Sequence, residues 1–367
     1  MIGVLGGGQL GRFLIHAARE WDLKLAVLDP DPEAPAGPVA HRFEVGSLLD
    51  FETVVRFARN VDLLTVEIEN VNADALEQIQ SRIPVRPSPG ILRMVQDKGL
   101  QKEFYRKHGI PTSDFSLHAG NTDLPEEGKR YPAILKLRRG GYDGRGVMRL
   151  NSPADRATAF AAPVVLEDLV AIEKEISVIV ARNARGQTIA YPSVEMVFTS
   201  SHVLDYQIAP AEISPVLEGE SQRIALELAE LLKLEGILAV EMFVAGTGKI
   251  LVNEIAPRPH NSGHSTIEAN RTSQYEQHLR MLLGHPPGPT DLIRPCALLN
   301  LLGIGTGEPV VHGLSEALAL PDVHVHLYGK AQSKPGRKMG HVTVLADSRS
   351  ILLDRLNQLR SLRVGPL

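Results

Sequence analysis

The sequence predicts an α/β protein with more than one domain, and three observations carry this prediction. The first 95 residues alternate short apolar runs with helical patterns, which is typical of an open, largely parallel sheet. From about residue 113 the pattern changes to strands separated by glycine turns, and a smaller strand-and-helix module follows residue 295. A chain of 367 residues, 43% of them hydrophobic, fills several cores, so we expect two to four lobes.

The expected elements follow in chain order. In the first part, strands are predicted at 2–5, 23–28 and 63–68, and helices at 9–21, 47–59 and 72–80. A helix over 96–108 ends at GIPT. Further strands are predicted at 133–137, 147–150, 164–166, 175–180, 188–191, 238–244 and 250–255. A helix near 222–232 interrupts them, and a helix over 350–362 closes the chain. We therefore predict domains over 1–95, 96–295 (two lobes, divided near 165–170) and 296–367.

A glycine-rich loop follows the first predicted strand. GGGQLG, Gly6 to Gly11, satisfies G-x-G-x-x-G, and the second predicted strand runs into Asp29. Both features are typical of a dinucleotide-binding domain, in which the loop holds a pyrophosphate and the acid holds a ribose. Amides at a helix N-terminus bind other phosphates as well, so the loop alone leaves the ligand open.

A second glycine-rich loop, LKLRRGGYDGRGV, spans residues 135–147. A strand delivers Lys136, and the glycines that follow let backbone amides approach phosphate oxygens. A hairpin with a flexible tip is the alternative, but it does not explain Tyr142, Asp143 and Arg145 in the same loop. The loop is no Walker motif, because its lysine precedes the glycines and no helix follows.

Two glutamates are predicted to face each other across a hairpin. If the hairpin is centred between Thr247 and Gly248, Glu241 pairs with Glu254, with their Cβ atoms about 5 Å apart. A divalent metal offsets the repulsion best, and oxygen ligands with Asn253 alongside suit Mg²⁺ bridging phosphates. A solvated face and a carboxylate pair for acid–base catalysis are the alternatives.

Two donor-rich segments follow. The segment APRPHNSGH carries Arg258, His260 and Asn261, and these donors could bind a small anion. A purely structural loop is the alternative. Zinc ligation by His260 and His264 is a further alternative, but it lacks a third ligand. Near the C-terminus a basic Pro–Gly turn, which is either solvated or a phosphate clamp, carries Lys330, Arg337, Lys338 and His341.

Composition restricts the partners. The net charge of −4 and the lack of a Lys/Arg block argue against nucleic acid or a membrane surface as main partner. The single cysteine, Cys296, excludes an internal disulfide, and we expect it to be a small buried hydrophobe. No leader pattern or membrane-length apolar run is present, so we expect a cytoplasmic protein.

Six motifs occur in an order that closely resembles the ATP-grasp superfamily and, within it, the N5-carboxyaminoimidazole ribonucleotide synthetase family of purine biosynthesis. They are GGGQLGR (6–12), ENV (69–71), GGYDGRG (140–146), NEIAPRPHNSGH (253–264), TSQYEQHLR (272–280) and RKMGH (337–341). The resemblance implies an ATP-grasp fold with an N-terminal Rossmann-like (pre-ATP-grasp) domain and a small C-terminal domain. It also implies that ATP phosphorylates bicarbonate to carboxyphosphate, which carboxylates 5-aminoimidazole ribonucleotide. Mg²⁺ (or Mn²⁺) would assist, and the enzyme would be a homodimer.

The resemblance also implies roles for individual residues. ATP would contact Lys98, Lys136, Gly140, Gly141, Tyr142, Asp143, Gly144, Arg145, Gly146, Glu167, Asp168, Leu169, Val170, Glu175, Asn253 and Glu254, with Glu241 and Glu254 binding the metal. The ribonucleotide would contact Gly8, Gln9, Leu10, Glu69, Tyr142, Asp143, Arg145, Lys330 and Arg337. Asp143 and Lys330 would handle protons or orient the substrate, and Arg258, His260 and Asn261 would line the bicarbonate or CO₂ pocket. On this interpretation the first glycine loop holds the 5′-phosphate of a ribonucleotide.

One departure from the family pattern concerns the nucleotide. Phe198 stands where members of the family commonly carry a histidine, and the nearest histidine is His202.

Three other functions are alternatives to this interpretation: another ATP-grasp ligase acting on a related ribonucleotide, a nicotinamide-dependent dehydrogenase, and a non-catalytic binding protein on an inactive ATP-grasp fold. The dehydrogenase leaves the Glu241/Glu254 pair unexplained.

Overall fold

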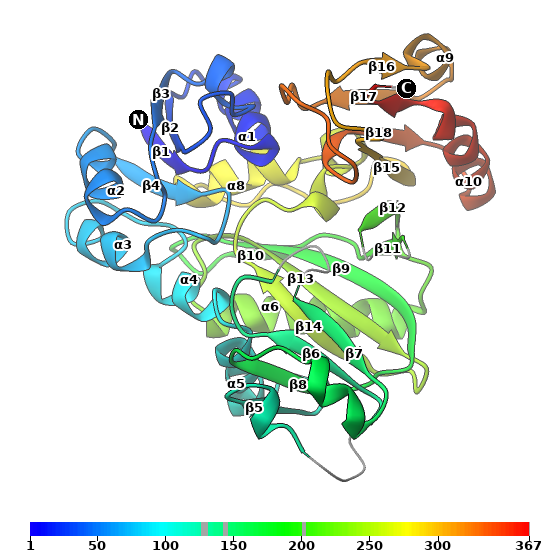
Figure 1. Cartoon of the computed structure of the whole chain (residues 1–367). Coiled ribbons are helices and arrows are strands. Elements are labelled where there is room, and N and C mark those ends of the chain that lie inside the picture. The colour runs from blue at the N-terminus through cyan, green and yellow to red at the C-terminus, as the bar shows by residue number, and fades with distance from the viewer. Residues whose placement is uncertain (126–130, 142–145, 200–202, 367) are drawn as a thin grey trace.

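The structure is a computed structural model, which describes residues 1–125, 131–141, 146–199 and 203–366. It is an α/β fold with an N-terminal sheet, a large sheet that includes strands of the C-terminal part, and a small sheet at the end of the molecule away from both termini (Figure 1). No helix in these ranges is long and apolar enough to cross a membrane.

The N-terminal sheet is parallel, as the alternating pattern predicted. Its strand order is β3-β2-β1-β4, with β1 in the middle beside β2 and β4. Its elements are β1 (Ile2–Leu5), α1 (Gln9–Arg19), β2 (Leu25–Asp29), β3 (Arg42–Val45), α2 (Phe51–Ala58), β4 (Leu63–Val66) and α3 (Ala73–Ile79). The sequence pattern missed β3, because this short edge strand is polar and half-exposed.

One of the next two helices was predicted over 96–108, and the shorter helix before it was not predicted. The two helices are α4 (Pro89–Val95) and α5 (Lys98–His108). Helix α5 begins at Lys98 because the Asp97 carboxylate accepts hydrogen bonds from the Gly99 and Leu100 amides. It ends at Gly109, whose φ of +69° suits a left-handed helix cap.

A four-stranded antiparallel sheet forms the small lobe. Its order is β5-β8-β6-β7, and it carries the second glycine loop between β6 and β7. The strands are β5 (Phe115–His118), β6 (Ala133–Leu137), β7 (Val147–Leu150) and β8 (Val164–Asp168). Lys136 lies one residue before the end of β6, and so near the loop.

The large sheet is antiparallel and runs through two of the predicted domains. Its order is β14-β13-β9-β11-β12-β15-β18-β17, with β10 beside β9. Its strands are β9 (Ile172–Arg182), β10 (Thr188–Ala190), β11 (Val194–Phe198), β12 (Leu204–Ala209), β13 (Gly236–Ala245), β14 (Ile250–Ala256), β15 (Cys296–Leu302), β17 (Val323–Leu327) and β18 (Lys338–Leu345). Because β12 pairs with β15, the predicted boundary at 295/296 lies within a continuous sheet. The three-domain division stays a prediction.

Helices cover both faces of the large sheet. Helix α6 (Pro215–Leu231) packs its apolar side on β9 and β13, around Ile224 and Leu228. On the other face Met281 of α8 (Gln274–Leu282) packs beside Ile179 and Ile237. Leu279 and Leu282 of α8 also join the core beneath α1. Helix α8 therefore joins the N-terminal sheet to the large sheet.

The C-terminal part has a core of its own around β15 and β18. Its remaining elements are β16 (Val311–His312), α9 (Leu314–Leu318), α10 (Arg349–Gln358) and β19 (Arg363–Val364). The short α7 (Thr266–Ala269) precedes α8. Cys296 is buried, as expected, and burial raises the pKa of its thiol to about 12.

Candidate active site

The β13–β14 hairpin brings two glutamates together. Glu241 pairs directly with Glu254, which confirms the predicted register at these residues. Nearer the tip the register shifts by one, since Met242 pairs with Val252 and leaves Asn253 as the extra residue of a bulge. A bulge re-aims side chains locally, and Asn253 reaches Lys136, whose Nζ donates to its Oδ1 at 2.8 Å. The bulge thus places the side-chain amide of Asn253, which directly precedes Glu254 in β14, where it binds Lys136.

The pair is partly buried and carries excess negative charge. Side-chain exposure is 19% at Glu241 and 40% at Glu254. Lys98 forms an ion pair with Glu254. Burial and the neighbouring Glu254 raise the pKa of Glu241. Burial also acts to raise the pKa of Glu254, but Lys98 and Lys136 together outweigh it, so this pKa is lowered. A divalent cation would compensate both carboxylates, so this donor set fits Mg²⁺.

Lys136 is held beside the pair by a buried carboxylate. Glu167 Oε1 lies 3.1 Å from Lys136 Nζ, and Glu167 Oε2 lies 3.2 Å from Lys102 Nζ. Ser113 Oγ also donates to Glu167 Oε2 at 2.7 Å. These partners outweigh burial and lower the pKa of Glu167 to about 2. Glu167 was predicted to contact ATP; in the structure its side chain has the separate role of holding Lys136 and Lys102.

Sequence reasoning missed Lys102. It lies one helical turn after Lys98 on α5, and this i, i+4 spacing puts both ammonium groups on one face. Its Nζ donates to Thr112 Oγ1 at 2.6 Å and to Ser113 Oγ at 2.9 Å. Lys98 pairs with Glu254 and Lys102 with Glu167, so this face of α5 meets two carboxylates of the site.

The second glycine loop is described only at its two ends. Gly140 and Gly146 have φ of +78° and +73°, a backbone conformation that favours glycine. Gly141 is described as well. Four residues with predicted roles in the loop lie outside the described residues: Tyr142, Asp143, Gly144 and Arg145. Their roles stay predictions, and His202 is also outside the described residues.

The predicted nucleotide-binding segment joins the small lobe to the large sheet. Glu167 and Asp168 end β8, and Leu169 and Val170 connect it to β9. Glu175 lies on β9 next to Phe243 of β13, and burial raises its pKa. Its charge also contributes to the raised pKa of Glu241. The ATP contacts of this segment stay predictions.

The loop after β14 brings two predicted residues to the acidic pair and to the N-terminal sheet. His260 Nε2 lies 3.4 Å from Glu241 Oε1, and Arg258 Nε lies 2.8 Å from Glu69 Oε1. Burial, and then Arg258, lowers the pKa of His260 well below its ordinary value. Asn261 is buried, and its Oδ1 has no hydrogen-bond partner among the described residues. One loop thus places Arg258 against Glu69 and His260 against Glu241.

His264 does not lie with this group. Its Nδ1 is 2.7 Å from Tyr275 Oη, and its ring stacks on His341 at 4.5 Å between centroids. It therefore belongs to a buried aromatic cluster between α1, α8 and β18.

The first glycine loop has partners inside the chain. Gly8 N–H donates to Glu67 Oε1 at 2.7 Å, and Gly7 N–H donates to Asp29 Oδ2 at 2.6 Å. Gly8 was predicted to bind a phosphate, but its amide has this other acceptor in the structure. Burial raises the pKa of both carboxyl groups. Asp29 is thus occupied by the loop instead of being free for a ribose.

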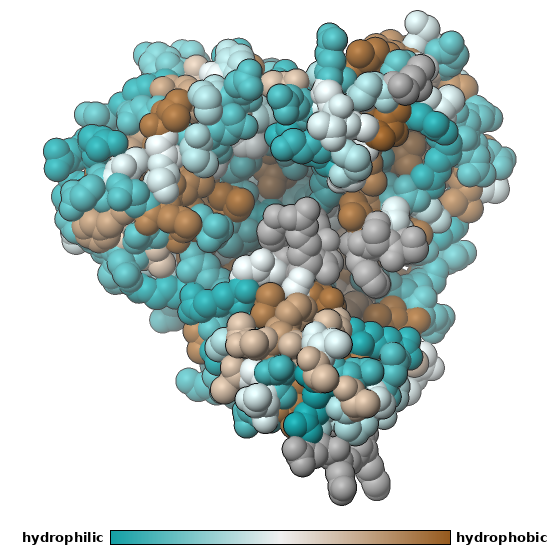
Figure 2. Space-filling model, in the orientation of Figure 1, coloured by the Kyte–Doolittle hydropathy of each residue, from teal (hydrophilic) through white to brown (hydrophobic). Residues whose placement is uncertain are grey.

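The C-terminal basic turn meets α1. Arg12 donates from Nη1 to the Tyr328 carbonyl at 3.2 Å, which brings the turn carrying Lys330 next to the first turn of α1. Lys330 Nζ donates to the Lys338 carbonyl at 2.7 Å. Arg337 donates to the Gln332 carbonyl at 2.7 Å and is more exposed. Figure 2 shows the surface hollowed between the N-terminal and C-terminal parts.

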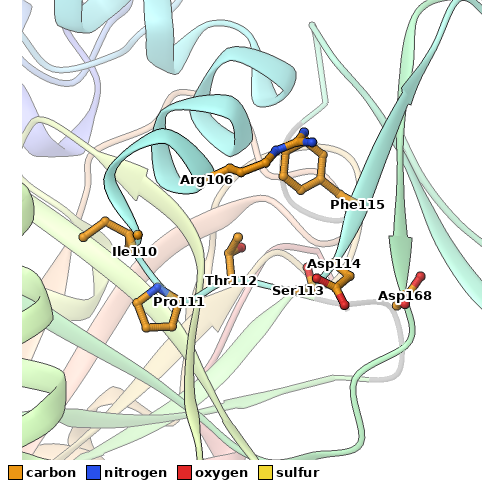
Figure 3. A pocket seen from close by; sticks show the side chains of 9 residues that line it. Arg106, Ile110, Pro111, Thr112, Ser113, Asp114, Phe115 and Asp168 are labelled. Carbon is orange, nitrogen blue, oxygen red and sulfur yellow. The ribbon is translucent and has the colours of Figure 1, made fainter.

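A separate open pocket of about 390 Å³ lies where α5 leads into the small lobe (Figure 3). Arg106 lies over the Phe115 ring, with Cζ 4.0 Å from the centroid, and Asp114 and Asp168 lie on the same side of the pocket as Phe115, away from Ile110 and Pro111. Thr112 and Ser113, which contact Lys102, also line it. The pocket therefore lies next to the residues that hold Glu167.

Comparisons with known proteins match all three parts of the chain. The family model of the ribonucleotide synthetase preATP-grasp domain matches residues 1–96, that of the ATP-grasp domain residues 103–275, and that of the phosphoribosylaminoimidazole carboxylase C-terminal domain residues 296–355. The N5-carboxyaminoimidazole ribonucleotide synthase of Bacillus subtilis is 35% identical over 94% of this chain and 91% of its own. This chain belongs to the N5-carboxyaminoimidazole ribonucleotide synthase family.

Solved structures of the N5-carboxyaminoimidazole ribonucleotide synthase family share the whole fold. The synthetase from Thermotoga maritima superposes with a TM-score of 0.92 at 39% identity, covering 100% of this chain and 99% of its own. The Aspergillus clavatus synthase, solved in complex with ADP and 5-aminoimidazole ribonucleotide, gives 0.89 at 33%, covering 97% and 98%. The fold and family predictions are confirmed.

Some relatives are longer. The phosphoribosylaminoimidazole carboxylase of Schizosaccharomyces pombe is 37% identical over 95% of this chain, which spans 65% of that protein. The chain therefore corresponds to one part of this larger carboxylase and to nearly all of the Bacillus synthase.

Proposed function

We infer that this chain is an ATP-dependent carbon–nitrogen ligase that carboxylates 5-aminoimidazole ribonucleotide to N5-carboxyaminoimidazole ribonucleotide in purine biosynthesis. Family membership over nearly the whole chain supports this function. The observation that carries it is the acidic pair Glu241/Glu254 with Lys98 and Lys136 beside it. This arrangement suits the transfer of a phosphoryl group from ATP.

Bicarbonate is the proposed carboxyl donor. Its hydroxide leaves poorly, so a bicarbonate oxygen attacks the γ-phosphorus of ATP, the bond to the β-phosphate oxygen breaks, and ADP leaves. The exocyclic amine of the ribonucleotide then attacks the carboxyphosphate carbon, phosphate leaves, and the amine loses a proton. The mixed anhydride reacts with water, so the site must exclude water while it exists.

Lys98, Lys136 and the ends of the second glycine loop are proposed to bind the ATP phosphates. Mg²⁺ at Glu241 and Glu254, with Mn²⁺ as the alternative, would neutralise negative charge on the transferring phosphoryl group. Glu167 supports this role of Lys136, because it holds the ammonium group next to Asn253. The backbone of residues 167–170 and Glu175 are proposed to bind the adenosine part.

The ribonucleotide is proposed to bind between the N-terminal sheet and the C-terminal turn. Glu69 would contact the aminoimidazole part, and its ion pair with Arg258 supports this placement near Glu241. The 5′-phosphate would bind the amides of Gln9 and Leu10 together with Lys330 and Arg337. Gly8 is left out of this phosphate site, because its amide donates to Glu67.

The carboxyl-transfer roles rest on the family pattern. Asp143 and Lys330 are proposed to orient the substrate or to accept the amine proton, and Tyr142 and Arg145 to contact the ribonucleotide. Arg258, His260 and Asn261 are proposed to line the bicarbonate or CO₂ pocket. A neutral His260 fits an acceptor role, because burial lowers its pKa. A homodimer in the cytoplasm is proposed on the same family pattern.

ADP release from Mg-ATP and bicarbonate, with and without 5-aminoimidazole ribonucleotide, tests the proposal. We expect strong stimulation by the ribonucleotide and its loss in Glu254→Gln. Glu52→Gln, an exposed carboxylate on α2, is the matched control and should behave as wild type. ADP release that ignores the ribonucleotide would contradict the substrate, and activity retained in Glu254→Gln would contradict the metal site.

A further inference from the structure

Two of the three glycines of the G-x-G-x-x-G loop, Gly6 and Gly8, leave room for the side chain of Glu67. A Cβ atom on Gly6 would lie 2.5 Å from Glu67 Cγ, and one on Gly8 would lie 2.7 Å from Glu67 Oε1. A Cβ on Gly11 would lie 3.1 Å from the Gly6 carbonyl oxygen and 3.4 Å from Glu67 Oε2. A larger residue at position 6 or 8 would therefore displace Glu67, which accounts for the glycines without any dinucleotide.

Glu67 bridges the loop with both carboxylate oxygens. Oε1 accepts the Gly8 N–H at 2.7 Å and Oε2 accepts the Gly11 N–H at 2.6 Å. Asp29 Oδ2 accepts the Gly7 N–H at 2.6 Å. These short, charge-assisted bonds hold the amides that a dinucleotide-binding loop would offer to a pyrophosphate.

The backbone amides of Gln9 and Leu10 lie between Gly8 and Gly11 and do not donate to Glu67. Gln9 and Leu10 are the first residues of α1, so their N–H groups have no acceptor within the helix. No hydrogen bond from either amide is found among the residues that the structure describes. The loop therefore offers two adjacent donors framed by the two amides that Glu67 occupies.

We propose that Glu67 is a positioning and specificity residue, which fixes the loop so that Gln9 and Leu10 bind one phosphate monoester while pyrophosphate and dinucleotides are excluded. The inference rests on the proposed function, in which this monoester is the 5′-phosphate of 5-aminoimidazole ribonucleotide. Exclusion follows from charge, because a second phosphate on the loop would approach the carboxylates of Glu67 and Asp29. Burial raises the pKa of Glu67, while the Gly11 and Gly8 amides and then the charge of Arg258 oppose this effect and favour the carboxylate form.

Two variants and a control test the proposal. Glu67→Gln replaces one acceptor oxygen by an NH₂ group that cannot accept an amide hydrogen, and Glu67→Ala removes both oxygens. We expect Glu67→Gln to shift the NMR resonances of the Gly8 and Gly11 amides and to raise the KM for the ribonucleotide about tenfold or more. The KM for ATP should stay unchanged. Inorganic pyrophosphate should shift these resonances in Glu67→Ala and not in wild type.

Several results would overturn the proposal. Unchanged Gly8 and Gly11 resonances in Glu67→Gln would contradict the contacts. A lowered Tm with an unchanged KM for the ribonucleotide would reduce Glu67 to a structural residue. Pyrophosphate shifts at these amides in wild type would contradict the exclusion. Glu52→Gln should match wild type throughout. If wild type shows no ribonucleotide-stimulated ADP release, the proposed function fails, while the amide resonances still decide whether Glu67 holds the loop.

Discussion

Lys102 is a lysine whose side chain lies almost entirely inside the protein, with 2% of the residue exposed. Burial lowers its pKa to about 8, although the neighbouring Glu167 opposes this effect. Through Glu167 it acts on Lys136, the lysine proposed to contact ATP. Removing Lys102 leaves Glu167 with Lys136 as its single ammonium partner, while Oε2 keeps only the hydroxyl of Ser113, so the carboxylate attracts Lys136 more strongly.

Lys102→Met should therefore weaken ATP binding without touching the ribonucleotide. We expect the KM for ATP to rise about tenfold, which corresponds to the loss of one charge-assisted interaction, with the KM for the ribonucleotide unchanged. Steady-state ADP release at varied concentrations of each substrate measures both constants. Lys107→Met, an exposed lysine on the same helix, is the control. Equal increases in both KM values would show a general disturbance instead of a link to Lys136.

At the residue level, hairpin symmetry was sufficient to predict the Glu241/Glu254 pair, because two strands joined by a short turn fix their own register. The bulge at Asn253 was not predictable, since it changes the register by one residue without any pattern signal. Glu67 was also missed: it meets the glycine loop across 59 and 56 residues of sequence. The i, i+4 spacing from Lys98 could have drawn attention to Lys102, but the sequence does not show that Glu167 is buried and lies beside it.

The carboxylate of Asp97 caps the start of helix α5 and also binds Arg138, which follows strand β6. Asp97 caps the helix and also accepts two hydrogen bonds of 2.8 Å from Arg138, one on each oxygen. Arg138 lies just after β6, so Asp97 fixes the first turn of α5, with Lys98, against the strand that carries Lys136. Lys98 and Lys136, the two lysines proposed to bind the ATP phosphates, are thus held relative to each other by Asp97.

Asp97→Ala should lower the free energy of unfolding by about 1–3 kcal/mol, because it removes the cap and leaves Arg138 without its carboxylate partner. Asp97→Asn keeps a cap acceptor and should cost less. Urea unfolding followed by circular dichroism measures both changes. Glu103→Ala, an exposed residue of the same helix, should change little. Equal losses in the two Asp97 variants would mean that the bidentate contact with Arg138 adds nothing to the cap.

Among the elements, the pattern predicted some with their observed bounds and missed others. The pattern predicted β1, β6 and β7 with their observed bounds. It missed β11 and β12, because these strands mix charged and polar residues with apolar ones, as in VEMVF and LDYQIA. Their place is set by pairing with β9 and β15, which are distant in sequence. Tertiary context therefore decides these strands.

At the scale of the whole molecule, an aromatic cluster joins all three matched parts of the chain. Phe13 of α1 lies 5.4 Å from His264 and 5.6 Å from His341 between ring centroids. His341 also stacks on His326 at 4.6 Å. Around these rings lie Tyr275, Tyr328, Glu268 and Lys338, whose hydroxyl, carboxyl and ammonium groups face the histidines. Burial lowers the pKa of His264 and His341 well below the ordinary value.

This cluster predicts a stability that falls on acidification. Below about pH 6.5 the unfolded chain takes up protons on these histidines and the folded chain does not, so their contribution is present above that pH and lost below it. We expect the free energy of unfolding to drop by up to about 1.4 kcal/mol per pH unit for each such histidine. Urea unfolding between pH 5 and 7.5 gives the slope. His341→Gln should flatten it, whereas the exposed His324→Gln should not; identical slopes in all three proteins would contradict the assignment.

The continuity of the large sheet has a consequence for any shortened form of this protein. Strand β12 pairs on its outer side with β15, from Tyr206 opposite Leu299 to Ala209 opposite Cys296, and Ile208 belongs to the C-terminal core. A polypeptide ending before Cys296 would leave this edge with unsatisfied amides and carbonyls beside exposed apolar side chains. Such edges pair with other chains. Residues 296–367 therefore also protect the edge of β12 from pairing with other chains. We expect a polypeptide without them to be insoluble, and not a smaller ATP-binding enzyme.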